Sequence, residues 1–216
     1  MIEVNPNDTT RAAAFEMWMK APMPMVTIFK KIDIKLLVKI SHRNGMKLNA
    51  LMCYIVAKAA SQIDEFFLLP VDGKLMRYDS LAVSVVVNVG DGEISTCDVP
   101  YSEDLREFYA DYINLTDTVR RTKKAYDLSQ THMVIGTSAL TQCDIDGVVN
   151  IYSGVFNNPF LTWGRYRKGF FKTMLPISFQ FHHTQMDGAH AALFLNKMQD
   201  EINAIARRQE YRNVIL

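Results

Sequence analysis

The segment from Phe181 to Gly188 holds the residue types most able to do chemistry in this chain, in the pattern His-His-x-x-x-Asp-Gly. It ends a run that alternates apolar and polar residues, which is the pattern of a β-strand with one buried face. The buried face would carry Ile177, Phe179, Phe181 and His183, and the other face Ser178, Gln180 and His182. An imidazole at the end of such a strand, followed by a turn glycine and a helix, is well placed to act as a base.

Two other interpretations of His183 stay open at this point. A single histidine on an apolar strand face is most often a core residue with satisfied hydrogen bonds. His183, Asp187 and His190 could also share one side of the turn, and three such ligands would suit zinc or iron. Their spacing follows no established ligand pattern, so we expect no metal site.

The length and composition are those of an ordinary globular chain. Its 216 residues are enough for one well-filled domain, and no linker, repeat or low-complexity segment divides them, so we expect a single domain over residues 1–216. Lys and Arg total 24 against 23 for Asp and Glu, which gives a net charge of +1. That balance gives no reason to expect a nucleic acid or a membrane surface as a partner.

The cysteines and the apolar runs indicate a cytoplasmic protein. Cys53, Cys97 and Cys143 are an odd number without metal-ligand spacing, which favours reduced thiols over a disulfide framework. The first residues have neither a charged leader nor an apolar core, so we expect no signal peptide. No apolar run approaches the roughly 18 residues that a transmembrane helix needs.

Hydrophobic periodicity predicts strands and helices that interleave along the chain. Strands are expected at 25–32, 74–78, 81–89, 93–96, 133–140 and 160–165, and a last strand, entered through a hairpin turn at 167–169, reaches His183. Helices are expected at 11–18, with its cap at 8–10, at 33–44, 48–63 and 102–124, and after Asp187-Gly188. Several strand pairs are joined by short turns. The pattern therefore predicts a mixed, mostly antiparallel sheet covered by helices rather than a doubly wound parallel fold.

Moving an acyl group from a thioester to a hydroxyl sets two chemical requirements. A base with a near-neutral pKa must take the hydroxyl proton, and a donor must stabilise the oxyanion that forms on the thioester carbonyl. Histidine, with an ordinary pKa of about 6.5, suits the first role, and a serine hydroxyl suits the second. His-His-x-x-x-Asp-Gly is also the signature of CoA-dependent acyltransferases, and the chain resembles the chloramphenicol acetyltransferases from about Arg11 to its last helix.

The resemblance implies catalytic roles for three residues. His183 matches the family's catalytic histidine, and Ser138, in Thr137-Ser138-Ala139-Leu140, matches the serine that stabilises the oxyanion. Thr162 matches a threonine that holds a water near the tetrahedral intermediate. The implied reaction is a direct attack of the hydroxyl on acetyl-CoA without an acyl-enzyme. Acetyl-CoA would be a co-substrate, and no cofactor would be permanently bound.

The resemblance also implies binding and structural roles. Lys47 and Tyr166 lie where the family places contacts with CoA. Arg11 resembles an N-terminal arginine that pairs with the aspartate of the motif, here Asp187, so we expect a structural ion pair that fixes the turn after His183. The family orients its histidine through a hydrogen bond to that residue's own backbone carbonyl, and the same is expected here.

The implied architecture is the two-layer α/β sandwich of the CoA-dependent acyltransferases, with a mixed, mostly antiparallel sheet covered by helices. The family works as a homotrimer with active sites at the subunit interfaces. Its histidine comes from one subunit, and the serine and most of the acceptor pocket come from the neighbour. We therefore expect His183 and Ser138 of one chain not to meet.

The acceptor pocket is where the resemblance is weakest. Family members that acetylate chloramphenicol carry aromatic side chains on and after the first helix, where this chain has Met17, Trp18 and Val26. Ile94 replaces another aromatic residue, Gln142 stands where a tryptophan follows the serine strand, and Asn49 replaces a tyrosine near the CoA site. A methionine-lined pocket is softer and less shape-selective than an aromatic one. The resemblance therefore constrains the reaction more than the acceptor.

Three functions remain open on sequence alone. The first is an O-acetyltransferase that acts on chloramphenicol or a similar hydroxylated xenobiotic, which would give antibiotic resistance. The second is the catalytic core of a 2-oxo-acid dehydrogenase acyltransferase, which shares the motif and uses another acceptor, although no lipoyl domain or Ala/Pro-rich linker is visible. The third is a non-catalytic trimeric scaffold. The presence of His183, Ser138 and Thr162 together favours an enzyme.

Overall fold

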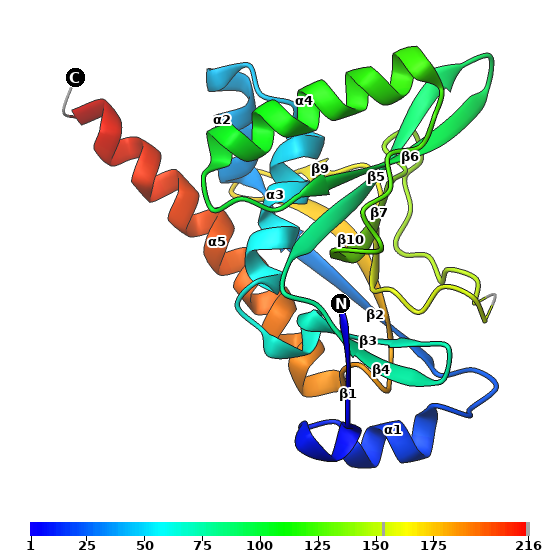
Figure 1. Ribbon diagram of the computed structural model, residues 1–216. Helices are drawn as coiled ribbons and strands as arrows, with labels where there is room; N and C mark the ends of the chain where they lie inside the picture. Colours follow the sequence, from blue (N-terminus) through cyan, green and yellow to red (C-terminus); the bar gives the residue numbers. More distant parts are fainter. Residues whose placement is uncertain (153, 215–216) are drawn as a thin grey trace.

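A seven-stranded mixed sheet forms the centre of the computed structural model, which describes residues 1–152 and 154–214 (Figure 1). Its strands are β2 (Met25–Asp33), β5 (Leu81–Gly90), β6 (Glu93–Pro100), β7 (Met133–Ala139), β8 (Phe160–Trp163), β9 (Arg167–Lys168) and β10 (Thr173–His182). Their order is β2-β10-β8-β7-β5-β6, with β9 paired to β10. The β5–β7 and β7–β8 pairs are parallel and the others antiparallel. The predicted mixed, mostly antiparallel sheet is confirmed.

A second, smaller sheet lies beside the first helix. Strands β1 (Ile2–Val4), β4 (Lys74–Arg77) and β3 (Leu68–Val71) pair in that order, all antiparallel. Sequence periodicity predicted β4 but neither β1 nor β3. Both missed strands are short, and β3 contains Pro70, a residue that weakens a strand prediction. Two short 3₁₀ helices, η1 (Pro6–Asp8) and η2 (Asp64–Phe67), precede α1 and β3.

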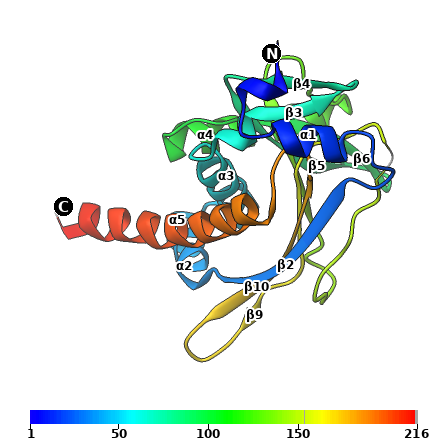
Figure 2. The same cartoon turned by 90° about the horizontal axis from the view of Figure 1, so that it is seen from below.

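Helices cover one face of the main sheet (Figure 2). They are α2 (Lys35–Asn44), α3 (Leu48–Ala60), α4 (Leu105–Thr122) and α5 (Gly188–Val214), while α1 (Ala12–Trp18) lies at one end beside β3 and β4. Gly45 ends α2 with a positive φ of 64°, a conformation that suits a glycine C-cap. Among the described residues, no helix combines the length and apolarity needed to cross a membrane.

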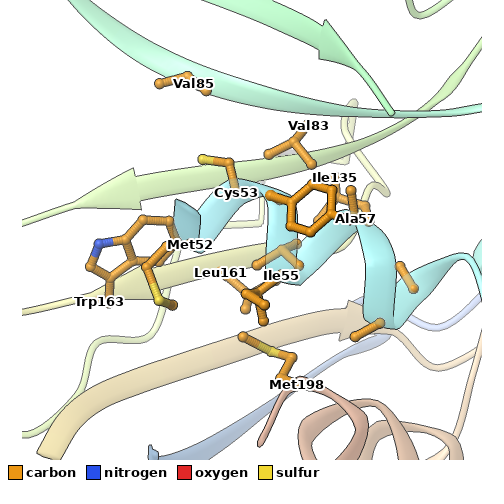
Figure 3. Close-up of a cluster of buried hydrophobic side chains, with 14 of the residues drawn as sticks. Met52, Cys53, Ile55, Ala57, Val83, Val85, Ile135, Leu161, Trp163 and Met198 are labelled. Atoms are coloured by element: carbon orange, nitrogen blue, oxygen red, sulfur yellow. The ribbon is translucent and has the colours of Figure 1, made fainter. Parts of the chain in front are cut away.

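Helix α3 is apolar on nearly all sides because it lies inside the core. Its side chains pack against β5, β7 and β8 and against Met198 of α5 (Figure 3). An all-round apolar helix is expected to be buried. One continuous cluster of buried apolar side chains runs from Ile32 to Ile202.

The prediction that β10 has one buried face is wrong, because both faces are buried. Ile177, Phe179 and Phe181 pack in the core under the helices. Ser178 and Gln180, on the other face, are buried by the segment between β7 and β8. The Ser178 hydroxyl accepts the backbone N–H of Val148 at 2.8 Å, and the Gln180 side chain donates to the carbonyl of Asn150 at 3.1 Å.

Three local predictions also need correction. Residues 8–10 do not cap α1; Arg11 occupies the N-cap position, without a side-chain cap. The hairpin turn before β10 lies at 169–172, because Arg167 and Lys168 themselves form β9. Strand β10 ends at His182, so His183 is the first residue of the turn rather than a residue of the strand.

Candidate functional site

His183 is held at the end of β10 by contacts on several sides. Its backbone N–H donates to the carbonyl of Pro24 at 2.8 Å, and its ring stacks on Trp18 with centroids 4.8 Å apart and planes within 7°. The residue is half-buried, so it does not belong to the apolar core. Nδ1 is buried and has no hydrogen-bond partner among the described residues, whereas Nε2 is not buried in this way. Nε2 is therefore the nitrogen open to a substrate.

Arg11 fixes the turn that carries His183. Its guanidinium is 4% exposed and lies 3.2 Å from Asp187 Oδ2, so the predicted ion pair is present. Arg11 also donates through Nε to the carbonyl of Thr184 at 3.0 Å and through Nη2 to the carbonyl of His183 at 2.9 Å. Among the described residues, the expected hydrogen bond from the His183 ring to that carbonyl is not formed, and the carbonyl accepts from the guanidinium.

The charge of Asp187 is expected to stabilise the fold. Asp187→Asn should lower the free energy of unfolding by about 1–3 kcal/mol, because hydrogen bonds to charged groups contribute in that range. The value is below that for a fully buried pair, since Asp187 is 39% exposed. Urea unfolding of the purified variants measures this change in the free energy of unfolding.

The same carboxylate also caps α5, which provides a matched control. Asp187 Oδ1 accepts the backbone N–H groups of Ala189 and His190 at 2.9 and 3.3 Å, contacts that asparagine can keep and alanine cannot. Asp187→Ala should therefore cost about 1 kcal/mol more than Asp187→Asn. An asparagine variant as stable as the original protein would show that the charge contributes nothing.

The pKa of Asp187 sets the pH range of this contribution. Burial acts to raise the pKa, but the N–H groups of His190 and Ala189, the charge of His190 and Arg11 together lower it below its ordinary value. The ion pair therefore stabilises the protein above the ordinary carboxylate pKa, and its contribution is lost as the pH falls through the lower folded value.

His182 has a structural environment rather than a catalytic one. It is buried on the face of β10 that also carries Gln180, and its Nδ1 accepts the backbone N–H of Thr184 at 3.1 Å. Burial, reinforced by the charge of His183, lowers the pKa of His182 to about 4. A neutral, enclosed ring that supports the turn is not placed to take a proton from a substrate.

Ser138 and Thr162 lie side by side on neighbouring parallel strands. They are Cα partners in the β7–β8 pair, so their side chains point to the same face of the sheet. Thr162 is buried and donates from Oγ1 to Asn150 Oδ1 at 3.3 Å, while Ser138 is half-buried. The structure thus brings together the predicted oxyanion donor and the predicted water-holding hydroxyl.

His183 and Ser138 do not meet within one chain. Ser138 is level with Thr162 on β8 and with Ser178 on β10, two strands away. His183 lies five residues beyond Ser178 along the chain. With about 3.3 Å per residue and about 4.8 Å between strands, the two Cα atoms are on the order of 20 Å apart. A base and an oxyanion donor must both lie within about 3 Å of the reacting atoms.

A pocket of about 370 Å³ lies where α3 begins and β8 ends. Its lining includes Leu48, Met52, Trp163, Arg165, Tyr166 and Lys168. Tyr166, one of the two predicted CoA contacts, is therefore in a cavity. Lys47, the other, is the N-cap residue of α3 and directly precedes Leu48; its side chain is exposed and its backbone N–H donates to the Tyr109 hydroxyl at 3.1 Å.

The four predicted acceptor residues do not form one pocket within a chain. Trp18 stacks on His183, and Val26 is the Cα partner of Phe181, so these two lie near the base. Met17 is 65% exposed. Ile94 is 70% exposed and lies on β6, the opposite edge of the sheet from β2, about 24 Å away over five strand spacings. This strand order excludes an acceptor pocket that contains all four residues of one chain.

Gln142 and Asn49, which stand where the family has a tryptophan and a tyrosine, each form a hydrogen bond within the chain. The carbonyl of Gln142, an exposed residue, accepts from Arg165 Nη2 at 2.9 Å. Asn49 lines the pocket at the start of α3 and donates from Nδ2 to the Tyr112 hydroxyl at 3.0 Å, while its buried Oδ1 has no partner within the described part of the chain. In the described part of the chain, no group of three or more His, Cys, Asp and Glu side chains is arranged to hold a metal ion.

Sequence reasoning missed two partners of the predicted site. Asn150 contacts Thr162 from the loop between β7 and β8, where no periodic pattern points to it. Glu65 contacts His190 over a long sequence separation, with Glu65 Oε1 3.1 Å from His190 Nε2. A carboxylate directly before an apolar run gives no local signal of such a contact.

Sequence comparison finds a consistent set of relatives. A sequence profile of the family described as chloramphenicol acetyltransferase matches residues 1–199. Chloramphenicol acetyltransferase 3 from Escherichia coli is 29% identical over 185 residues, which cover 82% of this chain and 85% of that protein. Chloramphenicol acetyltransferase 2 from Escherichia coli is 30% identical over 175 residues, which cover 78% of this chain and 81% of that protein.

Solved structures show the same fold. A chloramphenicol acetyltransferase matches with a TM-score of 0.81 at 20% identity, covering 92% of this chain and 98% of that one. The cubic core of the pyruvate dehydrogenase multienzyme complex matches with a TM-score of 0.68 at 18% identity, covering 100% of this chain and 93% of that one. At these identities the likeness shows the fold and nothing further.

Proposed function

The chain belongs to the chloramphenicol acetyltransferase family of acyltransferases, and on that premise we propose that it moves the acetyl group of acetyl-CoA to a hydroxyl of chloramphenicol or a similar small xenobiotic. The observation that carries the proposal is the placement of His183. Its ring is stacked on Trp18, its main chain is fixed by Pro24 and Arg11, and Nε2 alone is left open to a substrate.

The reaction needs one proton transfer and one acyl transfer. Nε2 of His183 takes the proton of the acceptor hydroxyl while its oxygen attacks the thioester carbonyl carbon. Ser138 donates to the oxyanion of the tetrahedral intermediate, and Thr162, oriented by Asn150, holds a water beside it. The C–S bond then breaks, and the CoA thiolate takes the proton from His183. No acyl-enzyme forms, and acetyl-CoA is the only co-substrate.

The pocket at the start of α3 is the proposed site of CoA. Its interior is apolar at Leu48, Met52 and Trp163, which suits the pantetheine chain, and Tyr166 offers an aromatic ring. Arg165 and Lys168 in its lining, with the exposed Lys47 beside it, supply cations for the phosphates. The pocket lies at the end of β8 and close to the segment after Ser138, so a thioester can reach the proposed oxyanion donor.

The proposed assembly is a homotrimer with active sites at the subunit interfaces. His183 and Ser138 of one chain are on the order of 20 Å apart, and Trp18 and Ile94 lie near opposite edges of the sheet. A neighbouring copy that brings one sheet edge against the other would complete both the catalytic pair and the acceptor pocket. In the described part of the loop between β7 and β8, five large apolar side chains are exposed, as expected of an interface: Leu140, Val149, Ile151, Val155 and Phe156.

The proposed location is the cytoplasm. Cys53, Cys97 and Cys143 are all free; Cys53 and Cys97 are buried, and Cys143 is exposed. Free thiols are typical of proteins kept in a reducing compartment.

The fold shared with the pyruvate dehydrogenase core does not support a dehydrogenase-complex acyltransferase activity for this chain, since the family relationship is to the chloramphenicol acetyltransferases.

Chloramphenicol is expected to be acetylated, but with a raised KM. Each aromatic contact missing from the acceptor wall weakens binding by about 0.5–1.5 kcal/mol beyond the area term, so two or three losses correspond to about one to three powers of ten. Release of free CoA from acetyl-CoA in the presence of chloramphenicol measures the reaction. Saturable release that depends on His183 is the expected result.

Position 17 offers a matched test of the acceptor wall. Met17 is well exposed, so Met17→Phe should fold normally and lower the KM for chloramphenicol, while Met17→Ala should raise it. If chloramphenicol gives no release above background while another small alcohol is acetylated, the acceptor assignment is wrong and the transferase assignment stands.

A further inference from the structure

The imidazole of His190 lies between two carboxylates. Its Nε2 is 3.1 Å from Glu65 Oε1, and its Nδ1 is 3.0 Å from Asp187 Oδ1. Glu65 is buried, and the hydroxyl of Thr10 donates to the same Oε1 at 3.0 Å. The ring therefore bridges η2 and the start of α5 through its contacts with Glu65 and Asp187.

The contacts continue from this bridge to the proposed base. Asp187, which meets His190 through Oδ1, meets Arg11 Nη1 through Oδ2 at 3.2 Å. Arg11 in turn donates to the carbonyls of His183 and Thr184. The Arg11 links are charge-assisted hydrogen bonds, the stronger class of such bonds. A continuous chain of polar contacts thus joins buried Glu65 to the carbonyl of the residue that would take the substrate proton.

The ring also contacts the backbone of Asp187. Its Nδ1 accepts the backbone N–H of Asp187 at 3.3 Å, and the backbone N–H of His190 donates to Asp187 Oδ1 at 3.3 Å. Without the ring, the residue that positions Arg11 would lose one of its partners. The groups with charge that face His190 are Glu65, Asp187 and, beyond it, Arg11.

We propose that His190 is a positioning residue, whose ring, held between Glu65 and Asp187, fixes Arg11 and so sets the orientation of His183. The inference rests on the proposed role of His183 as the base. His190 itself touches no substrate. Its contribution is the geometry of the turn, and displacement of a reacting group by about 1 Å can cost about 10²-fold in rate.

The first test compares His190→Gln with His42→Gln, the same change at an exposed position on α2. His190→Gln is expected to lower kcat by about 10- to 10²-fold. The KM for acetyl-CoA should stay unchanged, because the pocket lined by Leu48 and Tyr166 belongs to other elements. His42→Gln should change neither constant. A loss of kcat in His190→Gln no larger than its unfolded fraction would overturn the proposal.

The second test asks whether Glu65 acts through His190. Glu65→Gln alone should lower kcat in the same direction as His190→Gln. In the His190→Gln background the further change at Glu65 should have little effect, because coupled residues are non-additive. Two independent, multiplying losses would show that Glu65 acts by another route and would overturn the bridge.

The third test needs no substrate and separates this inference from the proposed function. Trp18 is stacked on His183, and Trp163→Phe leaves it as the single tryptophan. Its emission reports this stacking, and His190→Gln should shift the emission maximum while His42→Gln should not. If the original protein transfers no acetyl group but this difference is present, the function fails and the positioning stands. If transfer occurs and the emission maximum is identical in both variants, the positioning is overturned.

Discussion

Replacing His183 by alanine is expected to lower turnover by at least about 10²–10⁴-fold, the range for loss of a general base. The protein should remain folded, because the ring lies outside the core and its Nδ1 has no partner to lose among the described residues. Loss of the stacking contact with Trp18 should cost only a small amount of stability. Initial rates of CoA release at saturating acetyl-CoA, together with a thermal melt, measure both effects.

His182→Gln is the matched control for the neighbouring histidine. Because the His182 ring is enclosed and accepts the Thr184 N–H, this change should lower stability while keeping turnover within about ten-fold of the original. The folded pKa of about 4 lies below the ordinary 6.5, so the unfolded state binds a proton first as the pH falls. The original protein should therefore lose stability between these two values, and His182→Gln should lack that loss. An inactive His182 variant beside an active His183 variant would show that the wrong histidine was assigned.

The strands and helices that sequence could predict are those with strong local patterns. The β-branched run of β5, the apolar helix α3 and the glycine-terminated α2 each follow from neighbouring residues. The burial of the polar face of β10 could not be predicted in this way. It depends on a loop that returns from β7 and donates to Ser178, and nothing in the alternation of β10 shows that such a cover exists.

The candidate site likewise has some residues that local sequence predicts and others that only the fold brings together. His183 and its motif are contiguous, so their pattern indicates a base directly, and the family resemblance supplied Arg11 as the partner of Asp187. The contacts of Glu65 and Asn150 could not be predicted, because each joins segments that only the folded chain brings together. The distance between His183 and Ser138 also cannot be predicted from the local sequence. It follows from strand order, which places β10 and β7 on either side of β8.

Ser138→Ala is expected to lower turnover by about 10²–10³-fold, the usual cost of removing one oxyanion donor. The KM for acetyl-CoA should change little, because the hydroxyl interacts mainly with the transition state. Ser138 is half-buried and the change to alanine is small, so the melting temperature should be close to that of the original. An equal loss in acetyl-CoA binding would show that Ser138 contacts the ground state instead.

The same two inactive variants can show whether one active site uses two chains. In a cyclic trimer that takes His183 from one subunit and Ser138 from the next, any mixture of His183→Ala and Ser138→Ala subunits restores one intact site. Random exchange of equal amounts should therefore recover about one site in four. Mixing His183→Ala with the double variant His183→Ala/Ser138→Ala should recover none, which controls for exchange itself. The separation on the order of 20 Å within one chain requires this recovery if both residues serve one reaction. No recovery after verified subunit exchange would mean that His183 acts with a different oxyanion donor, one within reach on its own chain.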